Sequence, residues 1–333
     1  MHATKNLSRK HAIILVLFFI GSIHYARPGL SQEKIPVKIS ITKQLPCAIA
    51  IIAAKKNFFA EEGLAAEIHY DSGGIQVLES MAYGDIDVAM GISEVPFVMQ
   101  SFRKKNLVIL AAIGGDDISR VILVRKSAKI PSPEFLAGKR IATQENSAMH
   151  FFLHVFLNRL NLSERDVALT YMSPEEMLTA LYDGQIDACS IREPYLSKAK
   201  DMLQGDFLVF ELPRIYFGYN LVAAKRAYLK AHPETVRKIF RALKKAEDFS
   251  IRNTEETAKI MVETFEMTPE SVLQESNNRR SELFLDHGLI TTMEDVARWA
   301  IRGGLVAAQK IPNYILSIDY SYLQEIKPSV ERF

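Results

Sequence analysis

Two segments of the chain, residues 82–96 and 181–195, repeat one pattern of residue types at an offset of 100 positions. Each copy follows apolar residues at helical spacing, reaches a glycine suited to a left-handed helix end, and continues into a short apolar strand. Each strand is followed by Glu and Pro. The pattern predicts two similar α/β halves whose strands end facing a common cleft, because open α/β sheets bind ligands at the carboxyl ends of their strands. Three residues recur at this offset: Gly84, Ile86 and Asp87 return as Gly184, Ile186 and Asp187.

The length and charge of the chain limit what it can be. With 333 residues, 48% of them hydrophobic, the chain can form about two domains. Residues 1–31 hold four of the 41 basic residues and no acidic one, which leaves 37 basic against 39 acidic residues and a net charge of −2. This near neutrality excludes a broad nucleic-acid-binding surface, which must neutralise many phosphates.

The N-terminus has the pattern of an export signal. Basic residues precede an apolar run at 12–23, which as a helix would reach only about 18 Å, against about 30 Å of bilayer hydrocarbon. We therefore expect residues 1–31 to be a signal peptide and the protein to be periplasmic. An uncleaved membrane anchor is the alternative, since small residues are not clearly placed for cleavage. No cysteine precedes Cys47, so a lipid anchor after the apolar run is not available.

From Ile35 onward, strand and helix patterns alternate. We expect one lobe with a mainly parallel sheet from residues 35–122 plus 218–333, and a second lobe from 123–217. The strands at 119–125 and 217–223 would cross between the lobes as a two-strand hinge. After residue 223 the chain is predicted to be mostly helical. Three segments have the pattern of helix-starting boxes: 173–176, 253–256 and 291–294.

The segment around Ser147 is the first candidate for ligand binding. Asn146, Ser147 and Ala148 lie between a predicted strand and the helix that follows it. The free amides and positive dipole end of that helix favour an anionic group. Asn146 or Ser147 could instead act only as a helix cap, and the two roles are compatible.

The ends of the repeated strands supply a second group of candidates. Ser93 and Glu94 end the first strand, and Arg192 and Glu193 end the second. A bidentate Arg192 suits a carboxylate or sulfonate, whereas an unpaired Glu94 would repel an anion. A local pair between Arg192 and Glu193 with no ligand role is the alternative.

Further candidates follow from their expected places beside the cleft. Gly73 and Gly74 allow close backbone approach to a ligand but also suit a simple turn. Cys47 and Ala48 start the first predicted helix. Tyr216 and Tyr219 could contact the ligand or pack at the hinge. Cys47 and Cys189 fall in opposite lobes and are expected to be free, buried thiols, although the sequence leaves a disulfide open.

Patterns for catalysis are weak. His150 and His154 have the spacing of a metal pair, but no His-Glu-x-x-His arrangement completes it, and core or surface histidines are the favoured interpretation. Nucleophile elbows, Walker loops and Cys-x-x-Cys pairs are missing from the sequence. We expect no catalytic residue, no cofactor and no metal.

In combination and order, six segments resemble the solute-binding proteins of nitrate-, sulfonate- and taurine-type ABC importers and the related binders of thiamine pyrimidine precursors (NMT1/THI5-like). The resemblance covers nearly all of the chain after the signal segment. The segments are Lys55–Leu64, Gly84–Asp87, Leu136–Ala142, Asn146–Ser147, Gly184–Ala188 and Glu193–Tyr195.

The resemblance implies a type II periplasmic binding fold, with two α/β lobes, a two-strand hinge and a ligand cleft. It also implies a monomer that captures one small solute and delivers it to an ABC permease in the inner membrane. Family members often have Trp where this chain has Arg192, which shifts the expected solute from a flat pyrimidine to a small anion such as a sulfonate. A pyrimidine binder, a ligand-reading partner of a membrane sensor and an enzyme on the same fold are the alternatives. The enzyme is disfavoured because the cysteine-rich iron-binding run of the related fungal enzymes is missing.

Overall fold

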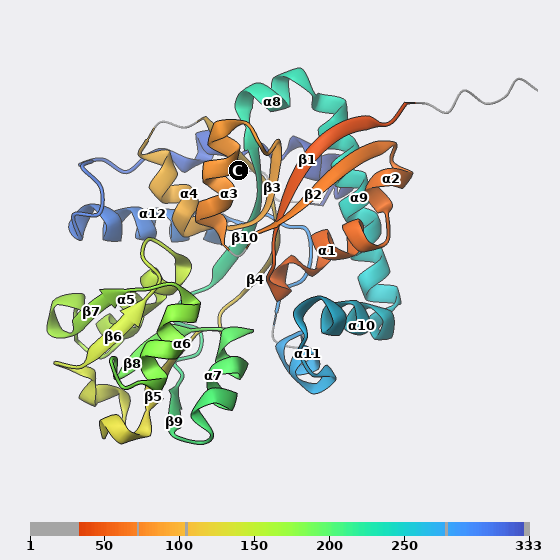
Figure 1. Cartoon of the computed structure of the whole chain (residues 1–333). Coiled ribbons are helices and arrows are strands. Elements are labelled where there is room, and N and C mark those ends of the chain that lie inside the picture. The colour runs from red at the N-terminus through yellow and green to blue at the C-terminus, as the bar shows by residue number, and fades with distance from the viewer. Residues whose placement is uncertain (1–32, 72, 104–105, 277–278, 330–333) are drawn as a thin grey trace, which may run out of the picture. The chain divides into compact units, whose positions relative to one another are not determined.

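The computed structural model describes residues 33–71, 73–103, 106–276 and 279–329, and all its sheets belong to one unit, Lys34–Phe333 (Figure 1). The predicted signal peptide at 1–31 lies outside the described residues. Within the described part, no helix combines the length and hydropathy needed to cross a bilayer.

Two five-stranded sheets share one strand order. The first runs β2-β1-β3-β10-β4 and the second β7-β6-β8-β5-β9. In each, the first three strands are parallel, and the fourth lies antiparallel between its neighbours. The strands of the first sheet are β1 (Ile35–Thr42), β2 (Leu64–Asp71), β3 (Val88–Ser93), β4 (Leu107–Asp116) and β10 (Gly218–Lys225). Those of the second are β5 (Val121–Arg125), β6 (Arg140–Thr143), β7 (Ala168–Tyr171), β8 (Ala188–Ile191) and β9 (Phe207–Phe210). The predicted two-lobed α/β fold is confirmed.

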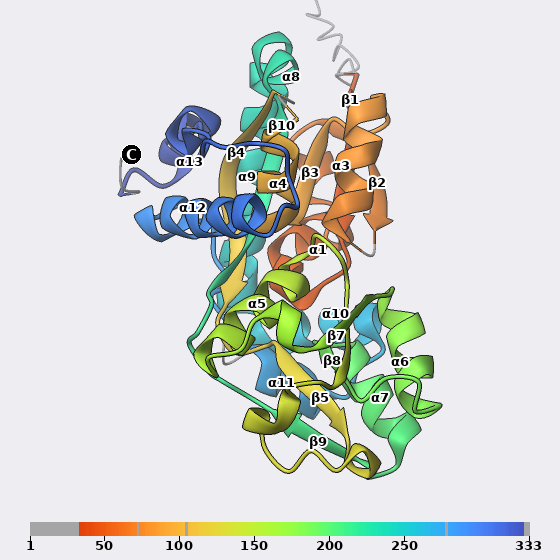
Figure 2. The ribbon, with the colours of Figure 1, turned by 90° about the vertical axis from the view of Figure 1, so that its left-hand side faces the viewer.

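The antiparallel strand in each sheet is the one that has just crossed from the other sheet. β4 leads to β5 in the second sheet, and β9 leads back to β10 in the first, as Figure 2 shows. β10 lies between β3 and β4, so the first sheet is not a simple parallel series. All but the last residue of β10 are buried, because it has neighbours on both edges and both faces.

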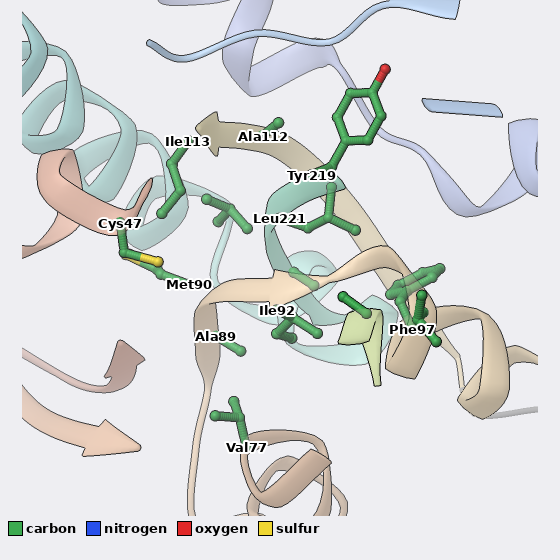
Figure 3. Close-up of a cluster of buried hydrophobic side chains, with 14 of the residues drawn as sticks. Cys47, Val77, Ala89, Met90, Ile92, Phe97, Ala112, Ile113, Tyr219 and Leu221 are labelled. Atoms are coloured by element: carbon green, nitrogen blue, oxygen red, sulfur yellow. The ribbon is translucent and has the colours of Figure 1, made fainter. Parts of the chain in front are cut away.

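Helices cover both faces of the first sheet. In the core around β3, β4 and β10, Cys47, Val77 and Phe97 come from the first helices and Tyr219 and Leu221 from β10 (Figure 3). The helices of the first sheet's half are α1 (Ala48–Lys55), α2 (Phe58–Glu61), α3 (Gly74–Tyr83), α4 (Glu94–Ser101), α8 (Arg226–Ala231), α9 (Pro233–Arg252), α10 (Thr254–Phe265), α11 (Pro269–Ser276), α12 (His287–Arg302) and α13 (Ser321–Ile326). The second has α5 (Ala148–Arg159), α6 (Pro174–Tyr182) and α7 (Tyr195–Leu203).

The repeated segments adopt the expected conformations. α3 ends at Gly84, whose φ of 91° is left-handed, and Gly184 follows α6 with a φ of 71°. β3 and β8 then begin at Val88 and Ala188, so the offset of 100 positions is kept in the fold.

The predicted helix starts have different outcomes. Ser173 forms a full capping box with Glu176. The side chain of Asn253 makes no capping hydrogen bond, although α10 does begin there. The box at 291–294 is wrong: α12 begins four residues earlier at His287, because the Asp286 carboxylate accepts a hydrogen bond from the Leu289 amide (3.3 Å) and caps the helix there.

Candidate functional site

The repeated segments meet at one small cavity of about 20 Å³. Every loop that supplies it follows the carboxyl end of a parallel strand: β1, β2 and β3 in the first sheet, β6 and β8 in the second. This is the edge at which open α/β sheets bind ligands. The lining residues are Gln44, Gly73, Gly74, Ile75, Ser93, Pro96, Gln144, Ser147, Ala148, Met149 and Arg192.

The N-terminus of α5 forms one wall of this cavity. The Ser147 hydroxyl accepts hydrogen bonds from the amides of Met149 (3.1 Å) and His150 (3.3 Å), and it donates to the carbonyl of Gln144 (2.6 Å). Ser147 is therefore a true helix cap that also borders the cavity, and its ligand-binding role stays a prediction. The positive end of the α5 dipole lies beside the cavity, where it favours an anion.

Arg192, which follows the neighbouring strand β8, also lines the cavity and carries a positive charge. Among the described residues, its guanidinium has no hydrogen-bond or ion-pair partner. Burial and the nearby positive charge of Arg120 lower the pKa of Arg192 to about 10, against a smaller opposing effect of Asp116. The side chain is still protonated at neutral pH, so the cavity contains an uncompensated cation.

Glu193 does not neutralise Arg192. Its carboxylate accepts hydrogen bonds from the amide (3.1 Å) and hydroxyl (2.9 Å) of Ser197 in α7. The local Arg192–Glu193 pair considered from sequence is not formed, and the charge of Arg192 is left for another partner.

Glu94, Tyr216 and Tyr219 lie beside the cavity rather than on its surface. The Glu94 carboxylate is buried and accepts hydrogen bonds from the Tyr216 hydroxyl and from the Tyr219 amide (2.9 Å). Tyr219 also donates to Asp286 (2.8 Å), which caps α12. Burial raises the pKa of Glu94, against the opposing effects of Tyr216 and Arg120. Through its hydrogen bonds to Tyr216 and Tyr219, Glu94 connects α4 with the β9–β10 crossing. These contacts position the crossing at the hinge.

A buried ion pair holds the other crossing. Asp116, the last residue of β4, accepts hydrogen bonds from Arg120 (3.2 Å) and from the amide of Ser119 (3.0 Å). The guanidinium of Arg120 lies 4.8 Å from the centre of the Tyr216 ring, which links the two crossings. Burial alone would raise the pKa of Asp116, but Arg120, Arg279 and the Ser119 hydrogen bonds outweigh it and hold the value at about 2.

The two cysteines are free and fully buried. Cys47 lies just before α1 in the first core, 4.0 Å from the side-chain oxygen of Asn220, and Cys189 lies within β8. Burial raises the pKa of both thiols to about 12, so neither is a ready thiolate. Cys47 and its neighbour Ala48 do not border the cavity.

Sequence reasoning missed some lining residues, chiefly Gln44, and did not single out Gln144 within the candidate segment at 144–148. Both follow strand ends, after β1 and β6, so the rule that selected Ser93 and Arg192 could have selected them too. Their amides add hydrogen-bonding groups from both sheets.

Two larger cavities adjoin the small one. A cavity of about 300 Å³ shares Gln44 and Arg192 with it, and one of about 570 Å³ shares Ile75 and Pro96. Of the predicted residues, Glu193 lines the former and Asn146 the latter. Side chains that line the small cavity therefore also line two larger ones.

The largest described cavity, about 910 Å³, lies elsewhere, between α5 and α12. Tyr216 is its only predicted site residue, and Arg298 there is already paired with Asp295 and Glu294. His150 and His154 point to Glu164 in this region, at 3.5 and 3.3 Å. We place the site at the smaller cavity because the strand ends and the unpaired Arg192 are there.

Paired sheets with crossing strands and a cavity at their carboxyl edges define the type II periplasmic binding fold. The chain belongs to the NMT1/THI5-like family, whose model matches residues 46–257.

Named relatives agree with this assignment. The chain is similar to a Bacillus subtilis protein named "Putative aliphatic sulfonates-binding protein", with 31% identity over 264 residues, 76% of this chain and 77% of that one. The periplasmic aliphatic sulphonate-binding protein SsuA of Escherichia coli has a similar structure (TM-score 0.73, 19% identity, 85% of this chain and 92% of that one). The periplasmic nitrate-binding protein NrtA of Synechocystis is also similar (TM-score 0.68, 15% identity, 90% of each chain).

Proposed function

We propose that this protein is the substrate-binding component of an ABC importer, which captures a small anion, preferably a sulfonate, in the periplasm and delivers it to a membrane permease. The observation that carries the proposal is the unpaired charge of Arg192 in the same cavity as the N-terminus of α5. A planar guanidinium and the positive end of a helix dipole together suit a group with several negatively charged oxygens. The names of the family relatives support a sulfonate.

The volume of the cavity supports a mechanism in which the solute is enclosed. About 20 Å³ holds about one water molecule, so a sulfonate can enter only when the two sets of loops separate. Movement about the β4–β5 and β9–β10 crossings, between lobes at 35–122 plus 218–333 and 123–217, would allow this. The solute stabilises the closed form through contacts that the open form lacks.

The test replaces Arg192 in the purified protein. A thermal-shift screen of sulfonates, carboxylates, nitrate and pyrimidines identifies the solute, because a ligand that prefers the folded state raises its melting temperature. We expect Arg192→Met to weaken binding of that solute about 30-fold, or about 2 kcal/mol, in calorimetry, because a charge-assisted hydrogen bond is lost.

The control is Lys198→Met, which removes a neighbouring cation that lines only the 300 Å³ cavity. This variant should bind within about twofold of the wild type. An unchanged dissociation constant in Arg192→Met would exclude Arg192 from the site. A pyrimidine as the only ligand would exclude the anion assignment.

An enzyme and a sensor partner are the competing functions. We propose that the protein leaves its solute unchanged, which is checked by recovering the bound compound after prolonged incubation; any turnover would contradict this. Adjacent genes for a permease and an ATPase would distinguish the importer from a sensor partner.

A further inference from the structure

His150 is a fully buried histidine behind the N-terminal end of α5, and it does not line the small cavity. Its backbone amide donates a hydrogen bond to the Ser147 hydroxyl (3.3 Å). Its ring accepts a hydrogen bond at Nδ1 from the backbone amide of Asn146 (3.3 Å). Both hydrogen bonds hold the short turn at 146–147, and Ser147 of that turn borders the cavity.

These contacts fix the protonation state in which His150 can hold the turn. A ring nitrogen that accepts a hydrogen bond carries no proton, so the neutral ring must carry its proton on Nε2. Nε2 lies 3.5 Å from a carboxylate oxygen of Glu164 and 3.4 Å from the hydroxyl of Tyr171, and both oxygens can accept. The neutral ring is therefore matched by partners on both sides.

The groups around the ring determine what a second proton would meet. Among the described residues, Glu164 and Tyr171 are the titratable groups that contact the ring of His150 from other elements, and Trp299 of α12 covers it at a centroid distance of 4.8 Å. On α5 itself, His154 contacts the same carboxylate (3.3 Å). Burial would raise the pKa of Glu164, but hydrogen bonds from the two histidines outweigh it and hold the pKa well below 4.5.

A second proton on His150 would be favourable toward Glu164 and unfavourable toward the turn. A protonated Nδ1 would face the N–H of Asn146, so two buried donors would be left without an acceptor. The ionised Glu164 would compensate the new charge, so the attraction of that charge for a solute at Arg192 is the smaller effect. The ligand-free turn can move to relieve the conflict, whereas a solute that contacts Ser147 holds the turn in place.

We propose that His150 is a positioning residue of the anion site and that a proton on its ring opposes solute binding. This inference rests on the proposed function. Capture is then strongest with a neutral ring and weakens toward acidic pH, within the range of about pH 5 to 8 in which histidines change charge. A sulfonate stays ionised throughout that range, and Arg192, with a pKa of about 10, stays protonated.

The experiment measures butanesulfonate binding by calorimetry between about pH 5 and pH 8. We expect the wild type to bind about tenfold more tightly at the upper limit, because the facing donors are absent there. His150→Asn removes the titrating ring but keeps an oxygen that can accept from the backbone, so it should bind within about threefold of the wild type at the upper limit and lose the pH dependence. His150→Phe lacks the acceptor and should bind weakly at every pH.

The matched control is His154→Asn, the same substitution one turn further along α5. His154 contacts Glu164 and Asn158, and among the described residues it makes no hydrogen bond to the 146–147 turn, so the tenfold pH dependence should remain. Melting curves check that each variant is folded. In the ligand-free wild type, the ¹H–¹⁵N NMR signal of the Asn146 amide should move in the same pH range, which tests the contact without any variant.

Equal affinity at the two pH limits, or a pH dependence that survives in His150→Asn and disappears in His154→Asn, would overturn the role of His150 and leave the anion site standing. An Asn146 signal that does not respond to pH would overturn it as well. Failure of butanesulfonate to bind the wild type at any pH would overturn the sulfonate assignment, and the Asn146 signal would then decide the role of His150 by itself.

Discussion

Under the proposed function, Arg192 would gain binding at the expense of stability. Its pKa is lowered to about 10 by burial and neighbouring arginines, so the folded, ligand-free protein holds a charge in an unfavourable place at every pH below about 10. The stability should rise as pH increases above about 10, because an arginine of the unfolded chain keeps its higher ordinary pKa and so binds more protons there. An anionic solute removes the same penalty by pairing with the charge.

The corresponding prediction is that Arg192→Met raises the melting temperature of the ligand-free protein at neutral pH. The gain should be about 2–4 °C for each kcal/mol recovered, because the methionine side chain fills much of the space without a charge. Differential scanning calorimetry with and without solute measures it. A lower melting temperature in the ligand-free variant would show that the charge stabilises the fold.

Residues whose role depends on their own strand or helix were predictable. Arg192 and Ser147 followed from the strand-end and helix-start patterns. Glu94 and Tyr216 could not be assigned in this way, because their partnership depends on β10 entering the first sheet next to β3. Glu94 and Tyr216 are 122 positions apart in the sequence, so no local pattern indicates that they are in contact.

At the scale of elements, the β4–β5 crossing contains a buried ion pair between Asp116 and Arg120. The Asp116 carboxylate is held at a pKa of about 2, so its contribution is complete above its ordinary pKa of 3.8 and is lost as pH falls through about 2. The Asp116–Arg120 ion pair at the hinge is therefore fully formed across the neutral pH range.

We predict that Asp116→Asn destabilises the protein by about 3–5 kcal/mol at neutral pH, because Arg120 would be left buried without its carboxylate. Urea unfolding measures this change. Asp206→Asn breaks the more exposed pair with Arg125 and should cost less than about 1 kcal/mol. Similar losses for both variants would contradict a special role for the buried pair.

Element boundaries illustrate why part of the fold was predictable. The glycine-ended helices and the strands that follow were placed correctly, since helix period, left-handed glycine and apolar strand agree there. The start of α12 was misplaced because Thr291 and Glu294 fit the same box pattern, while Asp286, the residue that caps the helix, lacks a glutamate or glutamine three positions later. A local sequence pattern cannot decide which of two such helix starts the chain uses.

On the scale of the whole molecule, Trp299 connects α12 with the second half. Its indole N–H donates to Glu164 (3.1 Å), and its ring contacts those of His150 and Phe151 at centroid distances of 4.8 and 5.3 Å. Burial would raise the pKa of Glu164, but hydrogen bonds from His150 and His154 outweigh it and hold the pKa well below 4.5. This contact stays ionised at neutral pH.

Trp299 is the only tryptophan of the chain and is 4% exposed, so it should report opening. We predict that adding the solute shifts its emission to shorter wavelength, because closure removes the indole from water. Glu164→Gln should shift the ligand-free emission to longer wavelength and weaken solute binding. Steady-state fluorescence titration checks both. A Trp299 emission spectrum that stays the same when solute is added would mean that the α5–α12 contact does not change on binding.

The exchange of strands between the sheets sets an order of assembly as the chain leaves the ribosome or the export channel. The second sheet lies within residues 121–210 and can form as soon as that stretch has emerged. The first must wait for β10, its strand between β3 and β4, although β1 to β4 emerge earlier. The first sheet, whose strands begin to emerge first, is thus completed last. A fragment ending near residue 116 would lack β10, a central strand, and would expose two unpaired strand edges that favour aggregation.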